Sequence, residues 1–288
     1  MVIVFNPAAG RRRAQLLWRV LDVMSANGVR LEIMETRHPG HAVELARSAA
    51  CAGVPLVVAA GGDGTIAEVA NGLSGSTCRL GIIPLGTANV LAHELGLPFA
   101  PRAVAASLAF SRSQAVWPGV VSGPGGSRLF VQMIGAGFDA QVVHQLSVRL
   151  KRAIGRGAYV AQSLLEAARY PFPPIRLRID GRPTEAFSVI ITKGHFYAGR
   201  YSLAPGATPT EKGFTVALFD HGGPLAALVY GAALTLNMIP RVSGLRLLRA
   251  TTVEICCTDI PAQADGDAAG QTPLLITDAA EPVNVVVG

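Results

Sequence analysis

The first 117 residues alternate between short apolar runs and longer segments in which apolar residues recur every three or four positions. The short runs predict strands at residues 2–5, 29–35, 56–60 and 80–83. The longer segments predict helices at residues 11–27, 41–52, 65–73 and 87–95. Wholly apolar strands between helices indicate a mostly parallel sheet that is covered on both faces. We therefore expect an N-terminal three-layer α/β domain.

The pattern becomes strand-rich after residue 117. Strands are predicted at residues 128–135, 175–180, 186–192, 214–219, 252–257 and 283–287. Two longer segments, 140–169 and 225–238, predict helices. We expect a β-sandwich as the second domain, with the boundary at Trp117-Pro118-Gly119. The predicted domains are residues 1–117 and 118–288, and the C-terminal strand is left open to return to the first domain.

The segment 222–240 contains no charged residue. A membrane span needs about 20 apolar residues, and this segment barely reaches that length while containing Gly, Thr, Asn and Pro. A buried helix of a soluble domain is therefore the better interpretation.

The charge balance favours an anionic partner. The chain has 25 Lys and Arg residues against 19 Asp and Glu, and nearly all its positive charge is arginine. Arginine suits phosphate groups, so a nucleotide, an anionic membrane or a nucleic acid would fit, although genome composition explains the bias equally well. Scattered aromatic residues argue against nucleic acid. A basic cluster, either a membrane contact or a solvated helix face, contains Arg149, Lys151, Arg152 and Arg156.

The cysteine pattern favours a reducing compartment. Cys51, Cys78, Cys256 and Cys257 form no C-x-x-C pair, and the opening residues lack the basic region of a signal peptide. We expect a cytoplasmic protein. No His, Cys and acid cluster has zinc spacing, and no Ser-His-Asp arrangement indicates a hydrolase.

A glycine-rich turn follows the predicted strand at residues 56–60. Its sequence is Gly61-Gly62-Asp63-Gly64-Thr65, and a predicted helix comes next. Glycines let a ligand approach the backbone, and the helix N-terminus offers free N–H groups to a phosphate. Asp63 would hold Mg²⁺ beside the phosphates, or it would simply cap a tight turn. The turn matches neither a Walker loop nor a G-x-G-x-x-G fingerprint.

Three more strand ends carry similar turns. They are Asn6-Pro7-Ala8-Ala9-Gly10, Thr36 with Gly40-His41-Ala42, and Pro84-Leu85-Gly86-Thr87-Ala88-Asn89. The carboxyl ends of parallel strands lie on one edge of a sheet, where ligands bind. We therefore expect a phosphate site at this edge.

These motifs together resemble the diacylglycerol kinase catalytic-domain family. The family includes YegS-like lipid kinases, bacterial diacylglycerol kinases, and sphingosine and ceramide kinases. The resemblance continues more weakly through Gly135–Ala140, Ala204-Pro205 and Asp265-Gly266-Asp267. It implies an N-terminal α/β domain like that of phosphofructokinases and NAD kinases, followed by a β-sandwich.

The resemblance implies ATP-dependent phosphorylation of a lipid hydroxyl with Mg²⁺, by an enzyme that binds peripherally at the inner face of the membrane. Diacylglycerol, phosphatidylglycerol and a sphingoid-type lipid are all open as substrates, and the oligomeric state is open too, a dimer included. Carried over by position, the nucleotide-binding residues are Asn6, Thr36, Gly61, Gly62, Asp63, Gly64, Thr65, Glu68, Gly86, Thr87 and Asn89. Among these, Glu68 is expected to fix the glycine-rich loop.

The resemblance also implies the catalytic base. The family has Asp-Gly-Glu in its second domain, and the matching residues here are Asp265-Gly266-Asp267. Asp265 would accept the proton of the lipid hydroxyl, with Asp267 as its catalytic companion. An Asp-Gly hairpin turn is the simpler interpretation of the same residues. Asp139 is either a helix cap or a substrate contact.

Several positions depart from the family pattern. The acids of a second-domain Mg²⁺ site are reduced to Glu211 beside Lys212, so we expect this site to be lost or much weakened. Ala67 and Val90 stand where polar family residues are common. A non-catalytic nucleotide- or lipid-binding homologue is therefore one alternative. An NAD kinase-like enzyme is another, because that class shares the G-G-D-G turn.

Overall fold

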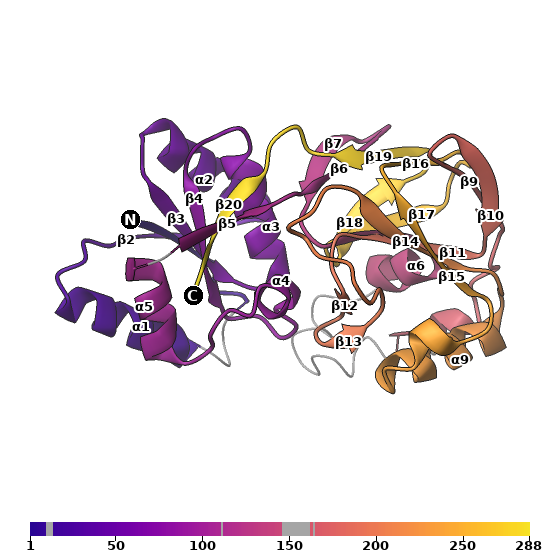
Figure 1. Ribbon diagram of the computed structural model, residues 1–288, viewed down its shortest axis with the longest axis horizontal. Helices are drawn as coiled ribbons and strands as arrows, with labels where there is room; N and C mark the ends of the chain where they lie inside the picture. The colour runs from indigo at the N-terminus through magenta and orange to yellow at the C-terminus, as the bar shows by residue number, and fades with distance from the viewer. Residues whose placement is uncertain (10–13, 111, 146–161, 164) are drawn as a thin grey trace. The chain divides into compact units, whose positions relative to one another are not determined.

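The computed structural model describes residues 1–9, 14–110, 112–145, 162–163 and 165–288 (Figure 1). By its internal contacts the chain divides into two compact units. Unit 1 is Met1–Pro118 with Ala279–Gly288, and unit 2 is Gly119–Asp278. The predicted basic cluster at residues 149–156 lies outside the described residues.

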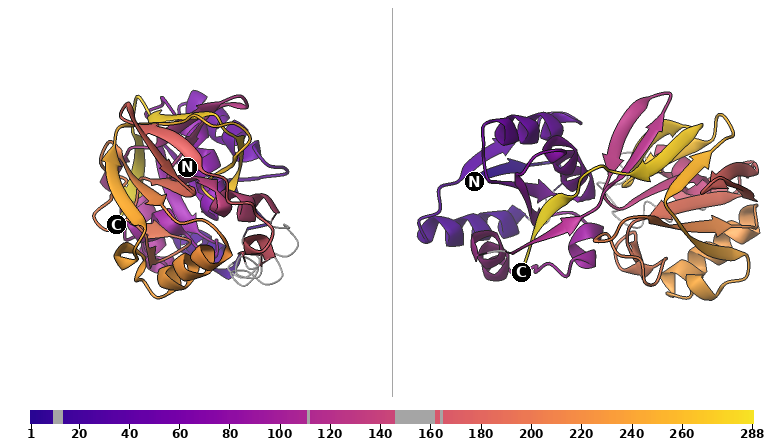
Figure 2. Two further views of the ribbon diagram at one scale, coloured as in Figure 1. Left: turned by 90° about the vertical axis from the view of Figure 1, so that its right-hand side faces the viewer. Right: turned by 45° about the horizontal axis from the view of Figure 1, so that its top comes forward.

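Unit 1 is built on one six-stranded sheet. Its strands are β1 (Val2–Phe5), β2 (Glu32–Glu35), β3 (Leu56–Gly61), β4 (Arg79–Pro84), β5 (Arg112–Val116) and β20 (Val283–Val287). They lie in the order β2-β1-β3-β4-β20-β5, and all pairs are parallel except β20 with β5. The yellow strand β20 lies beside the purple strands in the right-hand view of Figure 2. The last strand of the chain therefore completes the first sheet.

Helices cover both faces of this sheet (Figure 1). They are α1 (Ala14–Ala26), α2 (His41–Cys51), α3 (Asp63–Leu73), α4 (Val90–Glu94) and α5 (Pro101–Phe110). On one face, Leu17 and Val20 of α1 and Leu108 of α5 pack against Ile3 and Val58 of the sheet. On the other face, α2 and α3 pack together over β1, β3 and β4. The predicted three-layer domain is confirmed.

Unit 2 contains two six-stranded antiparallel sheets. The first has the order β10-β9-β16-β19-β6-β7, and the second has the order β15-β14-β11-β8-β17-β18. The first sheet's strands are β6 (Gly119–Gly123), β7 (Gly126–Phe130), β9 (Ile175–Ile179), β10 (Arg182–Ala186), β16 (Thr252–Ile255) and β19 (Leu274–Asp278). The second sheet's strands are β8 (Met133–Gly137), β11 (Ser188–Thr192), β14 (Phe214–Phe219), β15 (Leu245–Ala250), β17 (Pro261–Ala264) and β18 (Asp267–Gln271).

Apolar residues from both sheets share one core. Phe130, Ile175 and Val253 from the first sheet pack with Ile134 and Val216 from the second. Alternate residues along each strand point into this core, as β9 illustrates with its buried and exposed positions in strict alternation. The predicted β-sandwich is confirmed.

The remaining elements of unit 2 border the second sheet. They are α6 (Phe138–Gln145), the hairpin of β12 (Phe196–Tyr197) and β13 (Tyr201–Ser202), α9 (Pro224–Thr235) and η1 (Ile239–Arg241). The predicted helix at 140–169 overlaps α6, and most of its remainder lies outside the described residues.

The prediction that the uncharged segment 222–240 is a buried helix is wrong. Within α9 only Ala233 is buried, whereas the side of the helix that carries Leu225 and Leu228 is exposed. The error arose because an uncharged sequence predicts burial all round, and here one side of the helix has no neighbour among the described residues. Within the described part of the chain, no helix is long and apolar enough to cross a membrane.

Candidate active site

The loops that follow three strands of unit 1 lie next to one another. Parallel pairing places Phe5 opposite Ala60 and Gly61 opposite Pro84. The Asn6 N–H donates to the Ala60 carbonyl over 3.0 Å, and the Leu85 N–H donates to the Gly61 carbonyl over 2.9 Å. The sheet therefore gathers the loops after β1, β3 and β4 at one edge, as the strand order predicts.

Two of these loops touch backbone to backbone. A Cβ atom on Gly86 would lie 2.6 Å from the Gly62 Cα atom and 2.8 Å from Asn89 Oδ1. A Cβ atom on Gly61 would overlap the Thr65 side chain, whose hydroxyl accepts a hydrogen bond from Asn6 Nδ2 over 3.1 Å. Only glycine permits these approaches, so the glycines shape the edge itself.

Asp63 caps the short helix of the neighbouring loop. Its two carboxylate oxygens accept the backbone N–H groups of Asn89 over 2.9 Å and Val90 over 2.6 Å. Burial raises the pKa of Asp63, and these hydrogen bonds oppose the rise. The carboxylate therefore ties the loop after β3 to the start of α4. Its contact with ATP-bound Mg²⁺ stays a prediction.

Asn89 explains why α4 begins later than predicted. The residue adopts a left-handed conformation with φ 48°, and α4 starts only at Val90. Its Nδ2 donates to the Gly86 carbonyl over 2.8 Å, while its Oδ1 is buried without a partner among the described residues. Asn89 thus shapes the turn between β4 and α4.

Glu68 anchors a different loop from the one expected. Its carboxylate oxygens accept the N–H groups of Gly40 over 3.0 Å and Ala42 over 3.1 Å. These residues lie at the N-terminus of α2, in the loop after β2. Thr36, at the start of the same loop, donates its N–H to the Phe5 carbonyl over 2.8 Å. Glu68 and Thr36 therefore connect the loop after β2 to its neighbours.

The first backbone N–H groups of α3 have no carbonyl partner within the helix. The first helical hydrogen bond runs from the Ile66 N–H to the Gly62 carbonyl over 3.0 Å, so the N–H groups of Gly64 and Thr65 lie before it and stay unpaired within the helix. Thr87 is exposed in the adjacent loop. Small residues and open amides of this kind fit a phosphate group. Ala67 and Val90 are buried apolar side chains and offer it no polar contact.

The spacing of His38, His41 and Glu44 did not suggest a cluster, yet these side chains gather beside Gly40. Their ligand atoms lie within 4.8 Å of one another. However, the Arg37 N–H donates to His41 Nδ1 over 3.1 Å. A neutral imidazole that accepts at Nδ1 carries its proton on Nε2, so this ring as placed offers no free lone pair to a metal.

Asp265 occupies a two-residue turn between β17 and β18. Ala264 pairs with Asp267 across the turn, and both turn residues have positive φ, 52° at Asp265 and 84° at Gly266. This is the Asp-Gly hairpin that the sequence offered as the simpler interpretation. The turn does not exclude a catalytic role, because the Asp265 carboxylate points back into the protein and is buried.

Three successive backbone N–H groups hold the Asp265 carboxylate. Val131 donates to Oδ2 over 2.8 Å, and Gln132 and Met133 donate to Oδ1 over 2.9 and 3.0 Å. Burial raises the pKa of Asp265 to about 6, and the three hydrogen bonds together with the Arg128 guanidinium oppose the rise. A carboxylate with this pKa can accept a proton near neutral pH.

The prediction of one continuous strand at 128–135 is wrong, and the break between β7 and β8 leaves these three N–H groups available to Asp265. The chain leaves the first sheet of unit 2 at the end of β7, Phe130, and enters the second sheet at Met133. The crossing residues Val131 and Gln132 give their N–H groups to Asp265 instead of to a neighbouring strand. The side-chain amide of Gln132 is buried with no partner among the described residues.

Asp139 supports the turn that carries Asp265. It accepts hydrogen bonds from the Tyr197 hydroxyl and from Gln263 Nε2, the latter over 2.9 Å. Gln263 Oε1 in turn accepts the Gly266 N–H over 2.9 Å. Burial raises the pKa of Asp139, and both side-chain hydrogen bonds oppose the rise. No sequence motif connects Tyr197 or Gln263 with this site. The substrate contact suggested for Asp139 stays a prediction.

The other predicted acids of unit 2 are exposed. Asp267 begins β18, and Glu211 lies 3.6 Å from the Arg249 guanidinium. Among the described residues, Glu211 belongs to no group of three close metal-ligating side chains. Gly213, in the same loop as Glu211, accepts a hydrogen bond from the buried Lys193 ammonium over 2.8 Å, and this ammonium also bonds to Asp278 over 2.6 Å. The expected loss or weakening of a metal site at Glu211 stays a prediction.

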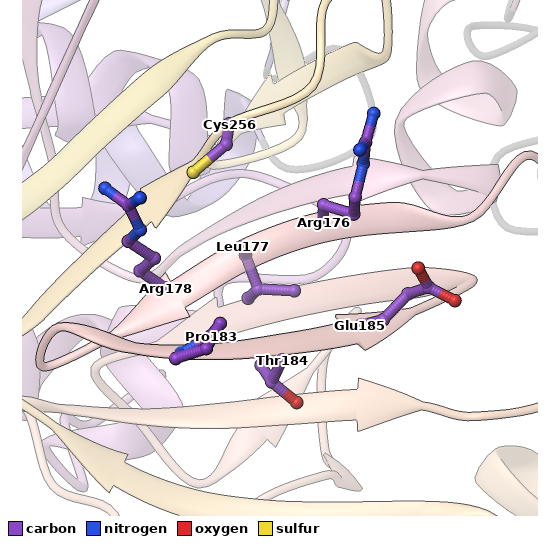
Figure 3. A pocket seen from close by; sticks show the side chains of 7 residues that line it. All are labelled: Arg176, Leu177, Arg178, Pro183, Thr184, Glu185 and Cys256. Atoms are coloured by element: carbon purple, nitrogen blue, oxygen red, sulfur yellow. The ribbon is translucent and has the colours of Figure 1, made fainter.

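An open hollow of about 590 Å³ lies on the outer side of β9 and β10 (Figure 3). Its lining residues are Arg176, Leu177, Arg178, Pro183, Thr184, Glu185 and Cys256. None of the predicted site residues lines it. The hollow therefore belongs neither to the strand-end loops of unit 1 nor to the Asp265 turn of unit 2.

The fold and these two groups of residues define a class of protein. In this class, a parallel α/β unit whose strand-end loops fit phosphate is followed by an antiparallel sandwich that holds a buried carboxylate. Family models agree. Residues 1–120 match the diacylglycerol kinase catalytic domain, and residues 132–287 match the YegS C-terminal NAD kinase beta sandwich-like domain. The chain belongs to the diacylglycerol kinase family, and the predicted enzyme class, a kinase, is confirmed.

Individual relatives support this assignment. A diacylglycerol kinase from Mycobacterium tuberculosis is 30% identical over 277 residues, which cover 92% of this chain and 84% of the relative. A probable lipid kinase YegS-like from Chromohalobacter salexigens is 36% identical over 184 residues. That match covers 62% of this chain and 58% of the relative, less than two thirds of its length.

Solved structures share the fold. A crystal structure of a proposed diacylglycerol kinase from Bacillus anthracis aligns with a TM-score of 0.76 at 20% identity. The alignment covers 100% of this chain and 96% of that one. The predicted combination of an α/β domain and a β-sandwich is therefore confirmed.

Proposed function

We propose that this protein transfers the γ-phosphate of ATP to the hydroxyl group of a lipid, with Asp265 as the general base. The observation that carries the proposal is the buried Asp265 carboxylate, held by three backbone N–H groups and with its pKa raised to about 6. Relatives named as probable lipid kinases and diacylglycerol kinases support a lipid acceptor.

In this mechanism the strand-end loops of unit 1 bind the nucleotide phosphates. The open N–H groups of Gly64 and Thr65 donate to phosphate oxygens, and the close approach of Gly62 and Gly86 keeps side chains out of their way. Asp63 and Glu68 hold the loops in place through backbone N–H groups. Mg²⁺, when bound with ATP, would neutralise phosphate charge, and Asp63 would help to hold it, because an ionised carboxylate keeps lone pairs beyond the hydrogen bonds that it accepts here.

Asp265 performs the proton transfer. The lipid hydroxyl oxygen forms a bond to the γ-phosphorus while the bond from that phosphorus to the bridging oxygen breaks and ADP departs. The hydroxyl proton passes to an Asp265 oxygen. Oδ2 is suited to this step because it accepts a single backbone hydrogen bond, whereas Oδ1 accepts two. Arg128, whose charge opposes protonation of Asp265, keeps the carboxylate ionised at neutral pH.

Phosphate transfer tests the proposal directly. The protein is incubated with γ-labelled ATP and Mg²⁺ in mixed micelles that contain diacylglycerol, phosphatidylglycerol or a sphingoid base, and Asp265→Asn is the control. A labelled, chloroform-soluble product that the variant does not form is the expected result. ATP binding without transfer to any of these lipids or to total lipid extract would indicate a non-catalytic homologue. In a parallel incubation with NAD in place of lipid, the formation of labelled NADP would indicate an NAD kinase.

A further inference from the structure

Helix α9 presents an apolar stripe to solvent. Leu225, Leu228, Val229 and Leu236 recur at helical spacing, and the exposed fractions are 75% at Leu225 and 69% at Leu236. Met238, just beyond the helix, is exposed as well. Large apolar side chains scattered singly are normal on a surface, but a continuous stripe marks an interaction site.

The opposite side of α9 is held by the protein. Tyr230, Ala233 and Leu234 pack with Phe219 and Leu247 on the outer face of the second sheet of unit 2. Tyr230 also donates a hydrogen bond to the Gly244 carbonyl over 3.0 Å. In Figure 1 the orange helix lies beside β15, with its length along the edge of the unit. The stripe is therefore presented by a fixed helix whose orientation the sheet determines.

The surroundings of the stripe carry positive charge. No acidic residue occurs from His221 to Val253. The hairpin of β12 and β13 contacts α9, and the Ser202 N–H donates to Asn237 Oδ1 over 2.8 Å. Arg200 at the tip of this hairpin and Arg241 at the end of η1 are both exposed, and neither forms an ion pair with a described residue.

We propose that α9 with Arg200 and Arg241 is a docking surface for an anionic lipid bilayer. An interfacial helix lies in the plane of the headgroups with its apolar side buried and basic residues at its border, and this surface has that arrangement. Positive charge near anionic lipid adds to the attraction. The choice of a bilayer also rests on the proposed lipid substrate, because such a substrate resides in a membrane.

Binding to vesicles tests the surface without ATP or turnover, so its outcome is independent of the kinase assay. The full chain is sedimented with vesicles of phosphatidylcholine alone or of phosphatidylcholine mixed with phosphatidylglycerol. We expect stronger binding to the mixed vesicles. The double substitution Leu225→Gln with Leu228→Gln should weaken it at least about tenfold, because each buried leucine contributes strongly. The double substitution Arg200→Glu with Arg241→Glu should weaken binding to the mixed vesicles alone, by at least about fivefold per arginine.

Matched controls separate docking from unfolding. Leu275→Gln changes an exposed leucine on β19, in the other sheet of unit 2, and should bind like the wild type. If the α9 variant fails to fold, hydrogen exchange on the wild type replaces it, and vesicles should slow exchange in α9. Unchanged vesicle binding by the folded α9 variant, or unchanged exchange in α9, would overturn the proposal. A wild-type dimer that the α9 substitutions dissociate, together with no vesicle binding, would assign the surface to a second copy of this chain.

Discussion

The strand-end loops of unit 1 and the Asp265 turn of unit 2 both hold carboxylates with backbone N–H groups, but they differ in the group that is suited to chemistry. In unit 1, Asp63 and Glu68 each tie one loop to a neighbouring loop, and the Gly64 and Thr65 N–H groups have no partner within their helix. In unit 2, three N–H groups hold the Asp265 carboxylate, and its pKa is raised to about 6. The contrast suggests that unit 1 contributes binding and unit 2 contributes proton transfer.

The largest expected effect tests this division at Asp265. Asp265→Asn keeps the shape of the side chain but cannot accept the hydroxyl proton, so the turnover number should fall by about 10²–10⁴-fold. ATP affinity, measured by calorimetry, should stay within about twofold if unit 1 alone binds the nucleotide. An equal loss of ATP affinity and turnover would break the division between the two units.

The next effect tests the glycine contact of unit 1. Gly86→Ala places a Cβ atom 2.6 Å from Gly62 Cα, so the two loops must separate. Overpacking of this kind costs about 1–3 kcal/mol, and ATP affinity should fall about tenfold while turnover at saturating ATP is retained. Gly125→Ala is the matched control because nothing lies within 4 Å of its added Cβ. Unchanged ATP affinity in Gly86→Ala would remove the loops from the nucleotide site.

The pH dependence of the reaction sharpens the assignment of the base. With its pKa raised to about 6, Asp265 loses its proton only above that pH, and only the ionised form can act as a base. The ratio kcat/KM should therefore be level above pH 7 and fall about tenfold per pH unit below pH 6. Nucleotide binding without lipid should not follow this curve. A profile that stays flat down to pH 5 would contradict Asp265 as the base.

The smallest expected effect concerns Glu68. Glu68→Ala leaves the Gly40 and Ala42 N–H groups without their acceptor, so the free energy of unfolding should fall by about 1–2 kcal/mol. ATP affinity should fall only a few-fold, because the phosphate-facing loops keep their own contacts. Glu35→Ala, an exposed acid on β2, is the control for charge. A Glu68→Ala variant as stable as this control would show that the anchor is dispensable.

Much of unit 1 could be predicted because the order of its strands determines which loops lie side by side. Short apolar strands between helices give a parallel sheet, and a parallel sheet brings the residues after each strand to one edge. Asn6, Gly62 and Gly86 are therefore close in space for the same reason that they follow strands in the chain. The sequence did not indicate which loop each carboxylate would hold. Glu68 bonds to the loop after β2, because helices α2 and α3 pack side by side.

For unit 2, the sequence predicted only the fold class. Alternating strands indicated a sandwich, but antiparallel sheets permit many pairings, and the pairing decides which residues meet Asp265. The chain crosses from β7 to β8 at Val131 and Gln132, and the sequence does not mark this crossing because no Gly or Pro occurs between residues 128 and 134. The supporting groups Tyr197, Gln263 and Arg128 lie far from Asp265 in sequence or carry no motif of their own.

The sequence by itself therefore determined the two fold classes, the family and the glycine-rich edge of unit 1. These depend on local periodicity and on short motifs, which act within a few residues of one another. The tertiary structure decided the rest: the raised pKa of Asp265, the commitment of Asp63 and Glu68 to neighbouring loops, and the exposure of α9. Each of these depends on burial and on hydrogen bonds between residues distant in the chain, and packing alone brings such residues together.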